Sequence, residues 1–183
     1  MGMGRDFYEA YPAARRVFEE ANRALDFDLT KVIFEGPEEE LKKTAITQPA
    51  ILTVSVAILS AAREDAGIPL EPMFVAGHSL GEYTALAAAG AISVADAVRL
   101  VHLRGSRMQD AVPLGVGAMA AVMGLEGEAI REICQRASTK GVCEMANYNA
   151  PGQIVISGEA PAVEAAAEML KEAGASKVIP LKV

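Results

Sequence analysis

The chain has 183 residues, enough to bury one core or a core with a small subdomain. Its 51% hydrophobic and 22% charged residues indicate a folded globular protein. The net charge of −7 gives no reason to expect nucleic-acid binding, and no signal peptide is recognisable. Two cysteines, Cys134 and Cys143, are too few for a disulfide framework and are typical of reduced thiols in a cytoplasmic protein.

Helices are predicted along the first third of the chain. Residues 5–25 alternate apolar and charged positions at helical spacing, and Pro12 divides them into two pieces. Residues 29–34 predict a further short helix. A longer apolar helix is expected to open at Thr47-Gln48-Pro49, with Pro49 at its first position and Gln48 placed to cap it. Its apolar run, residues 49–62, is too short for a membrane span, so we expect a buried helix.

Residues 73–81 carry the most informative pattern. The apolar run at 73–76 predicts a buried strand, Gly77-His78-Ser79-Leu80-Gly81 a sharp turn, and the following Ala- and Leu-rich segment a helix that ends near Gly90. This is the G-x-S-x-G nucleophile elbow, in which a strand-to-helix turn exposes one serine. A plain Gly-Ser turn is the alternative, because the five-residue pattern occurs by chance in roughly one chain in fifteen of this length.

The elbow assigns a chemical task to each of its residues. We expect glycines on both sides of Ser79 because strand and helix crowd together there and leave no room for a Cβ. Ser79 is the candidate nucleophile, and the amide of Leu80, at the positive end of the helix, is the candidate oxyanion donor. His78 precedes Ser79 directly and is poorly placed as its base, but it is in position to orient a substrate.

A helix over residues 93–111 contains the second candidate. Ser93 and Asp96 are typical of a capped start, and helical projection places Arg104 on the apolar stripe of this helix. A guanidinium among apolar neighbours is costly unless it meets an anion, so Arg104 is either a clamp for a substrate carboxylate, an edge residue that reaches water, or the partner of a core carboxylate. His102 projects away from the stripe and is expected at the surface.

The remaining chain alternates strands and helices. Strands are expected at residues 117–124, 142–149, 153–158 and 177–183, with helices at 126–137 and 161–173. This βαββαβ order predicts a ferredoxin-like subdomain. The fold class is therefore α/β: an incomplete α/β-hydrolase-like core with a parallel sheet over residues 1–114, and the ferredoxin-like unit over residues 115–182. Asn147 and Asn149 share one strand face and serve either turn chemistry or a site.

The string from Gly77 to Tyr83 resembles the malonyl-CoA:acyl carrier protein transacylases and the acyltransferase domains of polyketide synthases. Four further segments resemble the same family in the same order: residues 2–6, 47–50, 104–105 and 147–153. The resemblance implies that Ser79 forms a malonyl-serine intermediate and that Arg104 holds the malonyl carboxylate. It also places Gln48 beside the active site, and Asn147 and Asn149 in a groove for the acyl thioester. Malonyl-CoA and acyl carrier protein are the implied partners, with no cofactor, metal, nucleic acid or membrane.

The resemblance also shows what these residues leave out. The family's general base is a histidine in a Gly-Pro-Phe-His-like stretch, expected beyond Val183, and its Gly-Gln-Gly oxyanion element is expected before Met1. The chain is therefore expected to match the central part of a transacylase and to be a poor catalyst by itself. A serine hydrolase or thioesterase, and a non-catalytic module that binds CoA or carrier protein, remain the alternatives.

Overall fold

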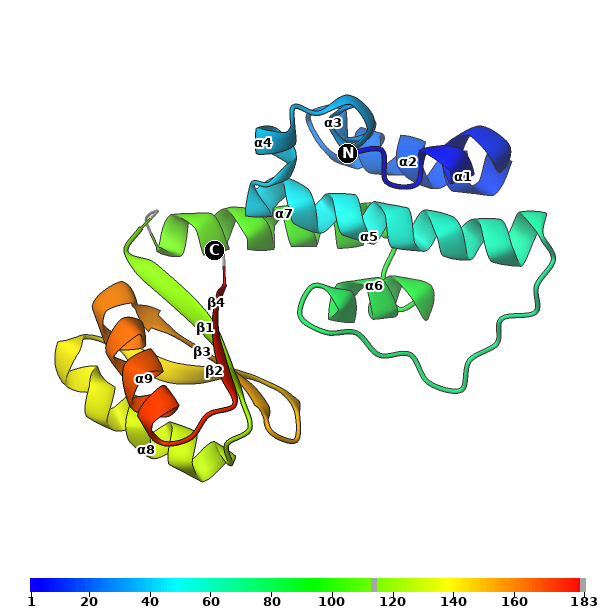
Figure 1. The fold of residues 1–183 in the computed structure, drawn as a ribbon. Coiled ribbons are helices and arrows are strands. Elements are labelled where there is room, and N and C mark those ends of the chain that lie inside the picture. The colour runs from blue at the N-terminus through cyan, green and yellow to red at the C-terminus, as the bar shows by residue number, and fades with distance from the viewer. Residues whose placement is uncertain (113–114, 182–183) are drawn as a thin grey trace. The chain divides into compact units, whose positions relative to one another are not determined.

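The computed structural model describes residues 1–112 and 115–181. The chain divides into two compact units, Met1–Ala111 (unit 1) and Val112–Val183 (unit 2). Each unit has a hydrophobic core of its own. The described residues contain both α and β structure. Unit 1 consists of helices, and unit 2 consists of a four-stranded sheet with helices (Figure 1).

Unit 1 is built from helices that start and stop where local signals require. The helices are α1 (Arg5–Ala10), α2 (Pro12–Ala24), α3 (Leu29–Glu35), α4 (Glu38–Leu41), α5 (Thr44–Ser60), the π-helical η1 (Ala61–Asp65), α6 (Gly81–Ala88) and α7 (Val94–Ala111). The expected break at Pro12 is confirmed, since Tyr11 before it is extended. The expected cap of α7 is also confirmed: the Asp96 N–H donates to Ser93 Oγ at 3.0 Å.

The core of unit 1 lies where α2, α5 and α7 pack together, and Figure 1 shows α5 and α7 side by side. Its largest fully buried aromatic and aliphatic side chains are Phe18, Leu29, Ile33, Leu52, Val98 and Val101. Burying each such side chain typically stabilises a fold by about 1.5–3 kcal/mol. Because Val98 and Val101 belong to α7, this packing fixes the helix that carries Arg104.

Helix α5 is longer than expected. Together with η1 it runs over Thr44–Asp65, 22 residues whose most apolar window has a mean hydropathy of 1.7, which is long and apolar enough to cross a membrane by length and composition. Half of its most apolar window, 50%, is buried inside the protein, which is the placement of a core helix. The expectation that Pro49 occupies the first helical position is wrong, because the helix begins at Thr44 and Pro49 lies inside it.

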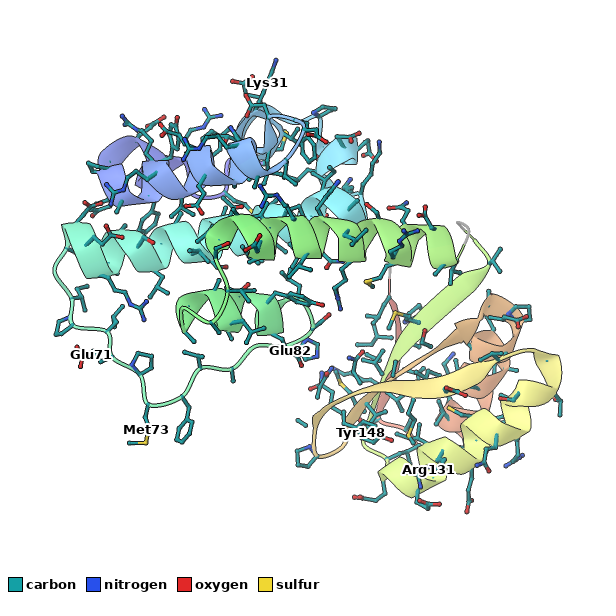
Figure 2. The ribbon with its side chains drawn as sticks, turned by 180° about the vertical axis from the view of Figure 1, so that it is seen from behind. Lys31, Glu71, Met73, Glu82, Arg131 and Tyr148 are labelled. Atoms are coloured by element: carbon teal, nitrogen blue, oxygen red, sulfur yellow. The ribbon has the colours of Figure 1, made fainter. Side chains whose placement is uncertain are left out.

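The strand expected at residues 73–76 is not formed. These residues belong to an extended loop between η1 and α6, and Met73 and Phe74 are 87% and 85% exposed. Figure 2 shows Met73 projecting outward from this loop. A strand requires a neighbour for its backbone N–H and C=O groups, and the described part of unit 1 contains no other strand. The expected parallel sheet is for the same reason not observed among residues 1–112.

Unit 2 follows the expected alternation of strands and helices closely. Its elements are β1 (Gly117–Met123), α8 (Gly127–Ala137), the 3₁₀-helical η2 (Ser138–Lys140), β2 (Cys143–Ala150), β3 (Gln153–Glu159), α9 (Ala160–Glu172) and β4 (Lys177–Leu181). The strand order is β2-β3-β1-β4, and every pair is antiparallel. The last strand was expected to reach residue 183, and residues 182–183 lie outside the described part of the chain.

The core of unit 2 lies between the sheet and its two helices. Figure 1 shows α8 and α9 on the same face of the sheet. Val122 of β1 and Ile154 and Ile156 of β3 point toward those helices. They belong to one buried cluster with Ile130 of α8 and Leu170 of α9. Because successive side chains of a strand point to opposite faces, Ala121 and Val155 lie on the second face of the sheet, where they are also buried.

Candidate active site

The turn into α6 holds Ser79 in an unusual backbone conformation. Its φ is 54°, the only positive φ of a non-glycine residue among the described residues. This left-handed region disfavours L-residues and is typical of strained functional positions. A Cβ added to Gly77 would lie 1.9 Å from the Gly81 carbonyl oxygen, so the expectation that this position must be glycine is supported by the space available. At Gly81 that expectation is wrong, because its added Cβ would meet nothing within 4 Å.

Helix α6 begins directly behind the serine. The Gly81 N–H donates to the His78 carbonyl at 2.8 Å, and the Glu82 N–H donates to the Ser79 carbonyl at 3.2 Å. The Leu80 N–H precedes both bonds and is therefore among the amides that a helix start leaves without an intrahelical acceptor. The positive end of the helix dipole adds to this arrangement. The turn thus places a backbone donor next to the Ser79 hydroxyl.

Arg104 of α7 connects the serine to α5. Its Nη2 donates to Ser79 Oγ at 3.0 Å, and its Nη1 donates to Gln48 Oε1 at 2.6 Å. Gln48 is only 5% exposed, and its Nε2 lies 3.4 Å from Met108 Sδ, one helical turn beyond Arg104. Helix α5, the turn before α6, and α7 are distant in sequence, and together they bring Gln48, Ser79 and Arg104 into one hydrogen-bonded chain.

The crossing of α5 and α7 sets the position of Arg104. Gly105 lies against the start of α5 so closely that a Cβ would be 2.5 Å from the Thr44 carbonyl oxygen. Three residues earlier, His102 Nδ1 lies 2.9 Å from the Ala45 carbonyl oxygen. That carbonyl is the acceptor that a residue at position 49 would ordinarily use, and Pro49 has no N–H.

His102 was expected at the surface, and this expectation is wrong. The side chain is half-buried, its ring lies 5.4 Å from the Phe27 ring between centroids, and Nδ1 donates to the freed Ala45 carbonyl. Sequence projection could not find this contact, since it depends on which carbonyl a proline on another helix leaves open. The contact between Met108 and Gln48 was likewise not predicted from the sequence.

His78 lies at a hollow on unit 1. The hollow measures about 540 Å³ and is lined by α5, by residues 75–78 and 80–81, and by α6, with His78 and Leu80 among its lining residues. Ile51 and Ala85 contribute from opposite sides, so the walls are mainly apolar. Of the unit 1 candidates, Ser79, Arg104 and Gln48 form the hydrogen-bonded chain, while His78 and Leu80 belong to the same turn.

The remaining candidates, Asn147 and Asn149, belong to β2 of unit 2. Asn147 pairs with Val155 and therefore faces away from α8 and α9, on the second face of the sheet. Irregularities in the register occur between Met145 and Asn147 and again between Tyr148 and Ala150. The expected simple alternation that would place both asparagines on one face is therefore interrupted at Asn149, which is exposed.

The two thiols are unsuited to nucleophilic chemistry. Cys134 and Cys143 are both buried in the core of unit 2. Burial raises the pKa of the Cys134 thiol from 9.0 to about 12 and also raises the pKa of Cys143. The thiolate is the reactive form of cysteine, so neither group competes with Ser79 as a nucleophile at neutral pH.

Comparison with known proteins gives this geometry a context. The model of the acyl transferase domain family matches residues 1–183. A malonyl CoA-acyl carrier protein transacylase of Bacillus subtilis is 50% identical over 184 residues, with 100% of this chain and 57% of the relative covered. The crystal structure of an acyl carrier protein S-malonyltransferase from Vibrio cholerae superimposes with a TM-score of 0.91 at 46% identity, covering 100% of this chain and 59% of that one.

A third comparison concerns a complex. A malonyl-transacylase solved with its type II polyketide acyl-carrier protein superimposes with a TM-score of 0.92 at 46% identity, again with 100% of this chain and 59% of that chain covered. The chain thus spans somewhat more than half the length of the relatives it matches. The match of the whole chain to the family model, together with an elbow serine bonded to the arginine of α7, leads to one conclusion: this chain belongs to the acyl transferase domain family.

Proposed function

We propose that the chain contributes the nucleophile and the carboxylate clamp of a malonyl-CoA:acyl carrier protein transacylase, as its relatives' names suggest. The observation that carries this proposal is the hydrogen bond of 3.0 Å between Arg104 Nη2 and Ser79 Oγ. A guanidinium binds a carboxylate bidentately. A carboxylate held by Arg104 would therefore lie next to Ser79. This placement suits an acyl group whose carboxylate is close to the thioester that Ser79 attacks.

The reaction would proceed in two transfers. Ser79 Oγ attacks the thioester carbonyl, the oxygen–carbon bond forms, the carbon–sulfur bond breaks, and coenzyme A leaves as the thiol once it has taken up a proton. The phosphopantetheine thiol of acyl carrier protein then attacks the malonyl-serine ester and restores the hydroxyl. The Leu80 amide is the proposed donor to the oxyanion of both intermediates. The general base would be the family's histidine, which lies in a stretch that these 183 residues do not contain.

The finer description of the fold belongs to the same proposal. The element order β1-α8-β2-β3-α9-β4 and the strand order β2-β3-β1-β4 support a ferredoxin-like subdomain over residues 115–182. The strained serine at the start of α6 supports an incomplete α/β-hydrolase-like core over residues 1–114. Asn147 and Asn149 are proposed to contact the acyl thioester, and His78 to orient it.

The acceptor would be an acyl carrier protein, as in the solved complex of a related malonyl-transacylase. The net charge of −7 offers no overall attraction to an acidic partner, so docking would depend on a local basic patch. The proposed location is the cytoplasm, in keeping with relatives named for malonyl transfer in bacteria.

Intact-protein mass spectrometry after mixing with malonyl-CoA tests this function. A malonyl adduct that persists on Ser79, is absent in Ser79→Ala and transfers to holo acyl carrier protein supports a transferase. Release of free malonate without transfer indicates a hydrolase or thioesterase. Binding of malonyl-CoA with no adduct, even in a form of the chain extended to its relatives' length, indicates a non-catalytic binding module and would refute the proposal.

A further inference from the structure

We propose that Ser79 and the carboxylate of the acyl donor compete for Arg104, so that the arginine holds the nucleophile until a carboxylate arrives. This inference rests on the proposed function and adds a specificity device to it. The evidence is the division of the guanidinium between two partners: Nη1 donates to Gln48 and Nη2 donates to Ser79. The nucleophile and the clamp are thus bonded to each other.

The planar geometry of the guanidinium limits how a carboxylate can bind to Arg104. A carboxylate can engage it on the edge formed by Nη1 and Nη2 or on the edge formed by Nε and Nη2. Nη2 has one N–H on each edge, so the N–H that donates to Ser79 Oγ at 3.0 Å already occupies one position of the edge on which it lies. A carboxylate that engages this same edge with two parallel hydrogen bonds is a stronger acceptor than one neutral hydroxyl, so it displaces the serine.

Gln48 fixes the position of Arg104 during the exchange. Its Oε1 accepts from Nη1 at 2.6 Å, and its Nε2 faces Met108 Sδ, which fixes the amide with its oxygen toward the arginine. Because Gln48 is buried, its bond to Nη1 holds the guanidinium in place while Nη2 changes partner. Only the bond to Ser79 then has to break when the ligand enters.

The consequence is that acyl donors are selected by the availability of the nucleophile as well as by their binding. An acyl group that carries a carboxylate frees Oγ, whose lone pair then becomes available for attack on the thioester. An acyl group without a carboxylate leaves Nη2 on Oγ and meets a serine whose oxygen is already accepting a charged hydrogen bond. Discrimination between malonyl and acetyl donors would therefore exceed what binding of the carboxylate alone provides.

Titration of the chain with sodium malonate, followed by NMR of the arginine side-chain signals or by calorimetry, tests the competition. If Ser79 competes, Ser79→Ala should bind malonate about three- to tenfold more tightly than the original chain. Ser79→Cys should gain similarly, because a thiol is a poor acceptor of nearly the same size. Acetate is the ligand control, and Arg107→Ala, which removes an exposed arginine of the same helix, is the protein control.

The outcomes separate this inference from the proposed function. Malonate binding that depends on Arg104 but has equal affinity in all Ser79 variants would overturn the competition and leave the clamp standing. A gain in Ser79→Ala that Ser79→Cys does not share would assign the effect to added space and would also overturn it. Malonate binding that is unchanged in Arg104→Ala would refute the clamp itself.

Discussion

Replacement of Gly77 by alanine should open the turn that presents Ser79. An added Cβ would lie 1.9 Å from the Gly81 carbonyl oxygen and 2.0 Å from the carbonyl carbon, whereas Cβ atoms in real structures essentially never come closer than 3.0 Å to such atoms. These atoms are backbone atoms, so no side chain can rotate out of the way and the turn must move. Overpacking of this kind typically costs about 1–3 kcal/mol, and we expect the upper end of that range.

Urea unfolding and hydrogen exchange together measure the effect. With an m-value of about 2 kcal/mol per molar urea, a loss of about 3 kcal/mol lowers the midpoint of unit 1 by about 1.5 M. The Gly81 and Glu82 amides, which close the turn onto the carbonyls of His78 and Ser79, should exchange faster in Gly77→Ala.

Gly81→Ala is the matched control for this experiment. Its added Cβ would meet nothing within 4 Å, so both the midpoint and the exchange of the turn amides should stay close to those of the original chain. If Gly77→Ala changed stability by less than about 0.5 kcal/mol, the range of an ordinary surface substitution, and left the amides protected, the reasoning from close approach would be refuted.

Three further outcomes are expected. In a form of the chain extended to its relatives' length, Arg104→Ala should reduce use of malonyl-CoA about ten- to a hundredfold more than use of acetyl-CoA in transfer assays, and equal losses would count against the clamp. His102→Ala should lower the free energy of unfolding of unit 1 by about 1–3 kcal/mol in urea titrations, since the Ala45 carbonyl loses its donor, whereas His102→Asn, which retains an N–H donor, should lose less. Because the folded pKa of Cys134 is raised from 9.0 to about 12, the unfolded chain releases this proton first, so the stability of unit 2 should fall as the pH rises through that window. Cys134→Ala should reduce this slope by about 1 kcal/mol per pH unit in urea titrations above pH 9.0, and an unchanged slope would contradict the assignment.

Features that depend on local patterns were predictable from the sequence. The strands and helices of unit 2 fall within one or two residues of the predicted ranges, because alternation and turn residues specify them locally. Helical projection placed Arg104 on an inward stripe, and the structure brings this residue to Ser79 and Gln48. The motif therefore identified Ser79 and helical projection identified Arg104, whereas the family resemblance placed Gln48 beside them, and none of these showed that the three residues bond to one another.

Features that depend on distant neighbours were not predictable in the same way. The run at residues 73–76 has the composition of a buried strand, yet a strand exists only where another strand pairs with it, and the described part of unit 1 provides none. The interior place of Pro49 depends on His102, which is on another helix and takes over the carbonyl that proline leaves open. Whether Gly81 needs to be glycine likewise depends on the space around it and not on the motif.

The conformation of Ser79 also restricts which substitutions the nucleophile position can accept. A φ of 54° is tolerated by an unbranched side chain, but a branched Cβ makes the same backbone a steric outlier. Threonine carries a hydroxyl as serine does, yet Ser79→Thr would have to leave the left-handed region or strain it, whereas cysteine would fit. In any lineage that keeps this turn, the backbone therefore disfavours threonine as the nucleophile before reactivity has any part in the choice.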